Sequence, residues 1–189
     1  MATLTYLTTT HFDFGAVQKI PTELRRAGIS KPFIATDNGV CAAGLVEKAI
    51  GAIGEEVPIS IFDETPGNPT EFAVLKAFEQ YKEDSCDGIL AIGGGSSMDL
   101  AKAVGLMASH EGPLEQYGAT VGGGKLIKTI PPLIAIPTTA GTGSEVSVGA
   151  VVIQENGLKQ TFASPKLVPA TAICDPELTL GLPAGLTAA

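Results

Sequence analysis

AIGGGSSMDLAKAVG, residues 91–105, joins an apolar run to a helix-like pattern through three glycines. In parallel sheets ligands bind at the carboxyl ends of the strands, and the glycines at 93–95 directly follow the apolar run at 89–92. Glycine lacks a Cβ and lets a large anion approach the backbone, while one of the two serines that follow can cap a helix whose free N–H groups point at that anion. The stretch therefore predicts a strand–turn–helix unit that holds a phosphate or pyrophosphate.

One alternative stays open for this stretch, because it matches neither common phosphate-binding pattern. Met98 stands where G-x-G-x-x-G requires its third glycine, and no Gly-Lys-Ser or Gly-Lys-Thr follows. On this stretch alone, a flexible turn between a strand and a helix, without any ligand, is the competing interpretation.

Short apolar runs alternate with helix-like segments around the glycines. Strands are expected at 31–39, 57–65, 87–95 and 132–139, and helices at 40–56, 69–84 and 97–109. One side of the helix at 69–84 is expected to carry Phe72, Leu75, Phe78 and Tyr81. Units of roughly 30 residues are typical of βαβ crossovers. The predicted fold class is α/β, a Rossmann-like parallel sheet flanked by helices.

The alternation changes after the strand at 132–139. Residues 146–163 read as two strands joined at Glu155-Asn156-Gly157, a strong hairpin signal, so a β-hairpin addition is expected there. One more strand is expected within 170–178. No linker divides the sequence, and residues 1–189 are expected to form a single domain.

Composition and charge exclude several classes of partner. The 189 residues are 44% apolar, enough for one good-sized core. The net charge of −8 would repel a polyanion, so nucleic acid is not an expected partner. No apolar run approaches the roughly 20 residues of a membrane helix, so no membrane partner is expected either. Cys41, Cys86 and Cys174 are odd in number and far apart, which is typical of reduced thiols in a cytoplasmic protein.

A second glycine-rich stretch, IPTTAGTGSEVS at 136–147, places hydroxyl side chains around Gly141 and Gly143 after a buried run. Such a loop can hydrogen-bond ribose, phosphate or amide groups without adding charge. An ordinary polar turn is the alternative. It is less attractive, because two glycine–hydroxyl loops would then meet at one edge of the sheet by chance.

Four stretches, in order, resemble signatures of the iron-containing, or group III, alcohol dehydrogenase family. They are PGNPT at 66–70, GGGSSMDLAK at 93–102, PTTAGTGSEV at 137–146 and AICDPELTLGLPAGLTAA at 172–189. The resemblance covers nearly the whole chain. It implies that residues 1–189 are a dinucleotide-binding domain of an NAD-dependent alcohol dehydrogenase or aldehyde reductase. The substrate of the full-length enzyme would be a small-molecule alcohol or aldehyde.

The resemblance also assigns cofactor contacts to matching positions. It implies that Gly94, Gly95 and Ser96 contact the pyrophosphate and that Thr138 and Thr139 contact the cofactor from the second loop. The remaining expected contacts are Asn68, Asp99, Thr142, Val148 through its backbone, and Lys159 near the nicotinamide ribose.

Asp99 opens the helix after the glycines, where the helix dipole stabilises an acid. This stabilisation can be its whole role, while the resemblance implies a polar contact near the nicotinamide or the substrate. Lys102, one turn further on, is expected either to pair with Asp99 at i, i+3 or to be solvated.

Asp37, at the end of FIATD, matches the position that meets the adenosine ribose in the family. A carboxylate there accepts a hydrogen bond from the 2′-hydroxyl and repels a 2′-phosphate, so NAD is expected as the cofactor rather than NADP. The alternative role of Asp37 is that of a turn former before Asn38-Gly39.

The resemblance further implies a helical domain in which an Asp and three His hold the metal, beginning just after GLPAGLTAA, and this domain is absent from the chain. His11 and His110 stand alone in sequence and are expected to be structural or surface residues. Iron or another divalent metal is therefore expected only in the full-length family enzyme. The isolated chain is expected to be inactive or nearly so, and an uncovered interdomain face would favour self-association.

Two other functions stay open. One is a non-catalytic dinucleotide-binding module that acts as a sensor or as a partner for another chain. The other is a domain of a related polyol dehydrogenase or dehydroquinate-synthase-like enzyme. GGGSSMDLAK together with PTTAGTGSEV favours the alcohol dehydrogenase branch.

Overall fold

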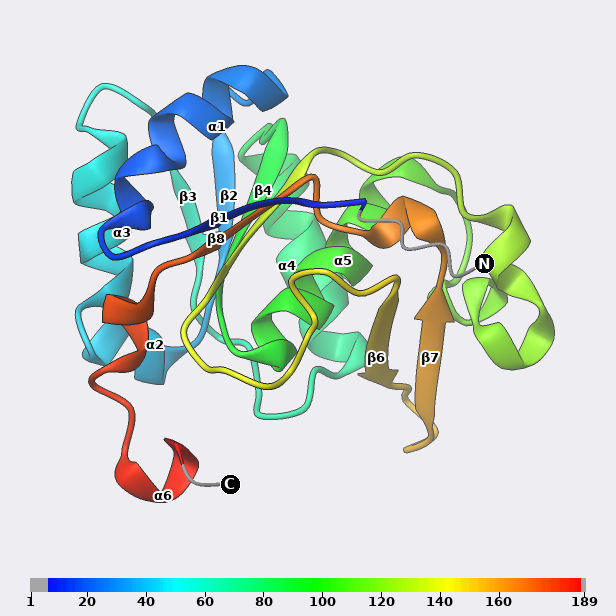
Figure 1. The fold of residues 1–189 in the computed structure, drawn as a ribbon. Helices are drawn as coiled ribbons and strands as arrows, with labels where there is room; N and C mark the ends of the chain where they lie inside the picture. The colour runs from blue at the N-terminus through cyan, green and yellow to red at the C-terminus, as the bar shows by residue number, and fades with distance from the viewer. Residues whose placement is uncertain (1–6, 188–189) are drawn as a thin grey trace, which may run out of the picture.

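The computed structural model describes residues 7–187, and they form a six-stranded parallel sheet covered by helices (Figure 1). The sheet, in the order β1-β8-β5-β4-β2-β3, is built from β1 (Thr9–Phe12), β2 (Pro32–Ala35), β3 (Ser60–Phe62), β4 (Gly88–Gly93), β5 (Leu133–Pro137) and β8 (Thr171–Cys174). The helices are α1 (Ile20–Ala27), α2 (Asn38–Ala42), α3 (Leu45–Ile53), α4 (Glu71–Glu83), α5 (Gly95–Ser109) and α6 (Ala184–Thr187). The predicted α/β, Rossmann-like class is confirmed.

Alternate residues of the central strands face opposite helical layers, as a pleated strand requires. Phe33 and Ala35 of β2 pack into the cluster that contains α4 and α5, whereas Ile34 packs with α1 and α3. The neighbouring strand β4 repeats this arrangement with Ile89 on the first side and Leu90 on the second. Because both faces are covered, these strands are apolar at every position rather than at alternate ones.

The side of α4 that meets the core differs from the expected one. Phe72 and Leu75 are exposed, and the buried positions are Ala73, Val74, Ala77 and Tyr81. Small side chains let α4 lie close to α5 and the sheet, so the largest apolar residues of this helix do not mark its inner face. Of the four predicted residues, Tyr81 is buried.

The helix expected at 40–56 is two helices, α2 and α3. Gly44 separates them with φ 72°, a left-handed conformation that stops α2 and starts α3 in a new direction. The sequence pattern did not reveal this break, because apolar residues continue on both sides of the glycine.

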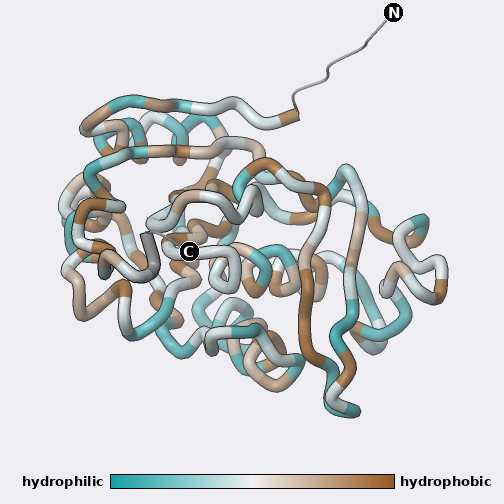
Figure 2. Tube along the Cα trace, turned by 60° about the horizontal axis from the view of Figure 1, so that its bottom comes forward, coloured by the Kyte–Doolittle hydropathy of each residue, from teal (hydrophilic) through white to brown (hydrophobic). Residues whose placement is uncertain are grey.

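The predicted hairpin is present and stands apart from the main sheet. Strands β6 (Gly149–Ile153) and β7 (Lys159–Ala163) are antiparallel and meet at the expected turn. Figure 2 shows the hairpin projecting from the body with a hydrophilic tip. Val152 and Phe162 are fully buried, which fixes one face of the hairpin to the α5 side of the core.

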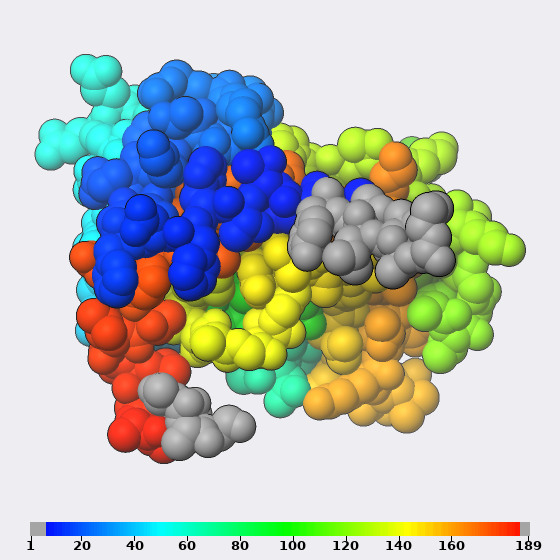
Figure 3. Space-filling view, in the orientation of Figure 1, coloured from blue at the N-terminus to red at the C-terminus, as the bar shows by residue number. Residues whose placement is uncertain are grey.

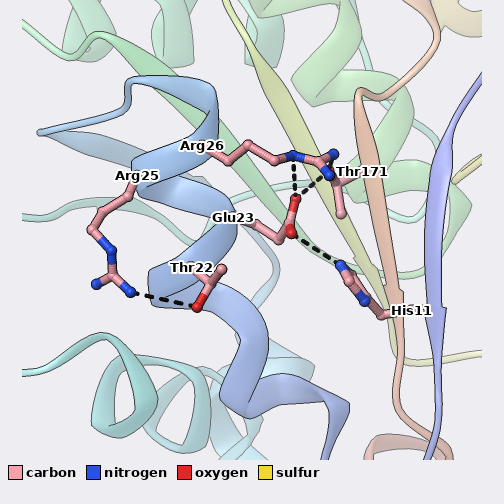
Figure 4. A network of polar contacts seen from close by, with 6 residues as sticks. All are labelled: His11, Thr22, Glu23, Arg25, Arg26 and Thr171. Carbon is pink, nitrogen blue, oxygen red and sulfur yellow. Dashed lines mark hydrogen bonds and ion pairs between the residues drawn. The ribbon is translucent and has the colours of Figure 1, made fainter.

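Strand β1 at the sheet edge is fixed to helix α1 by a buried carboxylate. Glu23 is 3% exposed, and its two oxygens lie 3.0 Å from His11 Nε2 and 3.1 Å from Arg26 Nε. Thr171 of β8 donates a hydrogen bond to the same carboxylate at 2.8 Å (Figure 4). Burial, the largest single effect, raises the pKa of Glu23. The hydrogen bonds with Thr171 and His11 and the charge of Arg26 together outweigh it, so the pKa lies below its usual value.

Short 3-10 segments fill several connections, at η1 (Ala16–Lys19), η2 (Leu114–Tyr117), η3 (Ala119–Val121), η4 (Gly123–Leu126), η5 (Pro165–Leu167) and η6 (Pro176–Thr179). Within residues 7–187, none of the helices combines the length and the apolar character that a membrane crossing requires.

Candidate functional site

The site lies where the order of the strands reverses. From β2 the chain goes to β3 on one side and then returns past β2 to β4 on the other side. In open α/β sheets, ligands bind outside the carboxyl ends of the strands at such a reversal. Asp37 lies two residues after β2, and Gly94 directly follows β4, so both lie at this point.

A cleft of about 1060 Å³ lies at this edge of the sheet. The predicted contacts that line it are Asp37, Gly94, Gly95, Ser96, Thr138 and Thr139. The opposite wall comes from α2, from the turn after β3 and from residues 178–183. In Figure 3 the loop after β5, in yellow, lies between the red C-terminal segment and the orange hairpin. The volume is large enough for a ligand of dinucleotide size, since ligand pockets commonly measure roughly 300–1000 Å³.

The first glycine of the turn is required by both conformation and space. Gly93 has φ 150°, and a Cβ at this position would lie 2.5 Å from Ser97 Oγ. The next residue, Gly94, is the N-cap of α5 and has no side chain that could accept a hydrogen bond. The first N–H groups of this helix are therefore not capped by the side chain of its N-cap residue. Ser96 Oγ instead donates to Gly67 O at 2.8 Å. The arrangement leaves a helix N-terminus that faces the cleft, which is an anion-binding element.

The second loop packs directly against the first. Thr138 N donates to Gly93 O at 3.0 Å, which continues the pairing of β5 with β4. A Cβ on Gly94 would lie 3.3 Å from Thr139 Oγ1, and one on Gly95 would lie 3.3 Å from the Cβ of Thr142. The two glycine–hydroxyl loops therefore form one continuous surface at the carboxyl edge of the sheet.

Asp37 contacts both helix α2 and the cleft. Its Oδ1 accepts a hydrogen bond from Val40 N at 3.0 Å and caps α2, while Ser97 Oγ lies 3.4 Å from Oδ2. The side chain is half-buried and lines the cleft. The cap occupies Oδ1, whereas Oδ2 has only the longer contact with Ser97, so the carboxylate can still face a ligand in the cleft.

The charged residues that line the described cleft are both acids, Asp37 and Glu64. Glu64 follows β3 and pairs with Lys76 of α4 at 2.5 Å. Thr65, the next residue, is 8% exposed, and its Oγ1 has no hydrogen-bond partner among the described residues. The sequence interpretation missed both residues. Their signal was their place just after a strand beside the reversal point, which only the sheet order reveals.

The remaining predicted contacts lie outside the lining of the cleft. Lys159 of β7 donates to Asn68 Oδ1 at 3.0 Å, which links the hairpin to the PGNPT turn beside the cleft. Thr142 lies against Gly95, and Val148 is 43% exposed in the loop before β6. Both carboxylate oxygens of Asp99 accept hydrogen bonds from the protein, from Ser144 and from Val151.

The expectation for Lys102 was wrong on both alternatives. Its side chain is fully buried and not solvated. Among the ion pairs of the described residues, none joins Lys102 to Asp99. Its ammonium group donates instead to Ser144 O, in the loop before β6, at 2.7 Å and to Gly149 O, at the start of β6, at 2.8 Å. The helix spacing predicted neighbours on α5, whereas the side chain reaches across to another element.

The histidines make structural contacts. His11 binds Glu23, as described above. His110 Nδ1 lies 2.8 Å from Leu106 O, and Lys128 N donates to His110 Nε2 at 2.7 Å. Across residues 7–187, no group of three or more His, Cys, Asp or Glu side chains is placed to hold a metal ion.

The sequence matches the family model of the iron-containing alcohol dehydrogenases over residues 8–176. It is 53% identical to 4-hydroxybutyrate dehydrogenase of Cupriavidus necator over 190 residues, covering 100% of this chain and 50% of that protein. It is 38% identical to NAD-dependent methanol dehydrogenase of Bacillus methanolicus over 177 residues, covering 93% of this chain and 46% of that protein. The chain thus spans about half the length of the curated relatives it matches.

Solved structures agree. A 1,3-propanediol oxidoreductase superposes with a TM-score of 0.91 at 33% identity, covering 99% of this chain and 49% of that one. Sulfoacetaldehyde reductase of Bifidobacterium kashiwanohense, in complex with NAD⁺, has a TM-score of 0.87 at 29% identity, covering 100% of this chain and 50% of that one. With its fold, its glycine turn and most of its length matched, the chain belongs to the iron-containing alcohol dehydrogenase family.

Proposed function

We propose that residues 1–189 are the dinucleotide-binding domain of an NAD-dependent, metal-dependent alcohol dehydrogenase. The full-length enzyme transfers a hydride between NAD(H) and a small alcohol or aldehyde. The observation that carries this proposal is the cleft at the strand reversal, where the N-terminus of α5 meets two glycine–hydroxyl loops. Family membership supports the choice of a nicotinamide dinucleotide as the ligand.

The pyrophosphate would bind at the N-terminus of α5, at Gly94, Gly95 and Ser96. No lysine or arginine lines the described cleft. The negative charge of the ligand would therefore be balanced by backbone N–H groups and the helix dipole, with hydroxyl groups of Thr138 and Thr139 as further donors. Bound NAD supplies a hydride acceptor at C4 of the nicotinamide ring.

NAD fits this charge pattern better than NADP. Asp37 and Glu64 both present carboxylates to the cleft, and a carboxylate accepts a hydrogen bond from a ribose 2′-hydroxyl but repels a 2′-phosphate. The nearest cation to Glu64, Lys76, is already paired with it. An NADP-specific site would need an uncommitted cation in this region.

The metal implied by the family does not fit the described residues, because they contain no suitable group of ligands. We therefore assign no step of the reaction to a metal held by residues 7–187. We place the metal site in the part of the enzyme that the family carries beyond this domain. For the same reason we expect residues 1–189 alone to bind the cofactor without turning over alcohol.

We propose 4-hydroxybutyrate, an alcohol with a terminal carboxylate, as the first substrate to assay with the full-length protein. The identity of 53% to 4-hydroxybutyrate dehydrogenase is well above the 40% to choline dehydrogenase of Bacillus subtilis. We also propose a cytoplasmic location, supported by free thiols at Cys41, Cys86 and Cys174.

A fluorescence titration of the purified 189-residue protein with NADH and, in parallel, NADPH tests the proposal. We expect saturable binding of NADH and weaker binding of NADPH. Absence of binding for both would overturn the assignment of the cleft. Binding of NADH together with an inactive full-length protein would instead favour a non-catalytic dinucleotide sensor.

A further inference from the structure

The ammonium group of Lys102 is enclosed by oxygen atoms of one short segment, residues 144–149. The lysine is 0% exposed, and hydrogen bonds run from Nζ to Ser144 O at 2.7 Å, to Ser147 O at 3.1 Å and to Gly149 O at 2.8 Å. The hydroxyl groups of Ser144 and Ser147 each lie 3.1 Å from the same nitrogen. All of these oxygens belong to residues 144–149, which comprise the end of the hydroxyl loop and the first residue of β6.

This loop is attached at both of its ends and contains two glycines that are open to space on one side. Its first residues continue the β5–β4 ladder through Thr138 N and Gly93 O. Its middle contains Gly141 with φ 93° and Gly143 with φ 67°, and a Cβ at either position would meet no atom within 4 Å. A segment with two unpacked glycines has little packing of its own to fix it. The contacts with Lys102, together with the hydrogen bond from Ser144 to Asp99, therefore hold the far end of the loop on α5.

Charge around the lysine is partly balanced from two elements. Ser144 Oγ donates to Asp99 Oδ1 at 2.7 Å, so this hydroxyl joins the ammonium group to the carboxylate one helical turn before it. Burial is the largest effect on the ammonium group and lowers the pKa of Lys102 to about 8. The carboxylates of Asp99 on α5 and Glu145 on the loop act in the opposite direction, because they stabilise the positive charge. An ammonium group has three protons, one for each of the three carbonyl oxygens, whereas a neutral amine has only two.

The order of the strands determines which part of a dinucleotide this loop would meet. The sheet places β2, β4 and β5 side by side. Asp37 follows β2, the glycine turn follows β4, and the hydroxyl loop follows β5. With the adenosine ribose at Asp37 and the pyrophosphate at α5, the nicotinamide half must extend over the end of β5 toward the loop.

We propose that Lys102 is a positioning residue for the nicotinamide half of the cofactor. Its ammonium group holds residues 144–149 on α5 and so keeps the hydroxyl loop in the conformation that forms one wall of the cleft. Lys102 itself does not line the cleft. This inference rests on the proposed function, and it adds a residue that acts through the loop.

The test compares two ligands that share the adenosine and pyrophosphate groups. ADP lacks the nicotinamide half, so Lys102→Met should weaken NADH binding by at least about fivefold and change ADP binding less than about twofold. Val104→Ala, a buried change two residues away on α5, is the matched control for lost stability and should leave the NADH-to-ADP ratio unchanged. Both variants are assayed well below their unfolding temperatures.

A pH series provides a readout that general destabilisation would not give. In the wild type, NADH binding should weaken relative to ADP binding as the pH rises through about 8, whereas Lys102→Met should show no such change. Should Lys102→Met fail to fold, Ser144→Ala takes its place, because it keeps the lysine and removes only the hydroxyl that joins it to Asp99.

Equal losses for both ligands, or no loss for either, would overturn the role of Lys102 while leaving a working cofactor site. A wild-type protein that binds neither NADH nor ADP would instead overturn the proposed function, and this inference with it.

Discussion

The carboxylate of Asp37 caps helix α2 at 3.0 Å from Val40 N and lines the proposed ribose end of the cleft at the same time. In the proposed site, one residue thus links the local stability of α2 to the choice of cofactor. The two roles can be separated, because glycine is accepted at an N-cap at a cost of only a few tenths of a kcal/mol but carries no charge.

Asp37→Gly is expected to shift the preference toward NADPH, by about tenfold or more in the ratio of the two dissociation constants. The physical reason is the loss of the carboxylate that repels a 2′-phosphate. Parallel fluorescence titrations with NADH and NADPH measure the ratio, and thermal unfolding should show little change in stability.

Glu79→Gln is the control for the change in net charge, because Glu79 is exposed on α4 and pairs only with Lys82 at 3.5 Å among the described contacts. It should leave the ratio unaltered. An Asp37→Gly protein with the wild-type ratio would show that Asp37 serves α2 alone.

The N-terminus of α5 offers a second prediction. Gly95→Asp places a negative charge where the pyrophosphate would lie, and its Cβ would lie 3.3 Å from that of Thr142. We expect NADH affinity to fall by at least about tenfold, because like charges at a helix N-terminus compete for the same N–H groups. Isothermal titration calorimetry provides the measurement.

Gly51→Asp is the matched control, because it makes the same glycine-to-aspartate substitution at a residue that does not line the cleft. Gly51 is exposed on α3, and a Cβ there would meet nothing within 4 Å. The control should bind NADH like the wild type. If both aspartate variants bind normally, the glycine turn is a strand–helix connection without a ligand.

Burial of Lys102 makes a prediction about stability at high pH. Its pKa is lowered from 10.5 to about 8 in the folded protein, so between these values the unfolded chain binds more protons than the folded one. The free energy of unfolding should therefore gain a contribution that grows as the pH rises from about 8 to 10.5, on the order of 3 kcal/mol at most. Below about pH 8 this contribution is absent.

Urea unfolding of the wild type and of Lys102→Met over this range isolates the effect. Tyr81 changes stability in the opposite direction above about pH 10, because its pKa is raised from 10.0 to about 12 mainly by burial. Both proteins share Tyr81, so the difference between them reports Lys102. A difference that stays constant with pH would contradict a lowered pKa.

Much of this fold could be predicted because its central strands are buried on both faces. Continuous apolar runs such as 89–92, followed at once by glycine, indicated strands, a parallel sheet and the edge at which ligands bind. Six predicted contacts then met in one cleft because β2, β4 and β5 are neighbours.

Features that depend on distant contacts were not visible in the sequence. Strand β1 is short and largely exposed, and it pairs with β8 from the far end of the chain. Glu64 and Thr65 join the cleft only through the position of β3 in the sheet. The partners of Lys102 lie more than 40 residues further along the chain, so helical spacing could not predict them.

Glu23 carries the last prediction, since it joins α1 to the edge strand β1 through His11 and to the neighbouring strand β8 through Thr171 (Figure 4). Glu23→Gln removes the charge that Arg26 pairs with while keeping the size of the side chain. We expect a loss of stability of about 1–3 kcal/mol near pH 7, the range for buried hydrogen bonds to a charged group. Urea unfolding measures this loss.

The loss should disappear in acid. Because the pKa of Glu23 is held below 4.5 in the folded protein, the carboxylate stabilises the fold above that pH, and this contribution is lost as the pH falls through the folded-state pKa. The stability difference between wild type and Glu23→Gln should therefore shrink as the pH falls below 4.5. Glu79→Gln, an exposed change, should show a small difference throughout. A Glu23→Gln difference that persists unchanged in acid would show that shape and packing at this position stabilise β1, and that the charge does not.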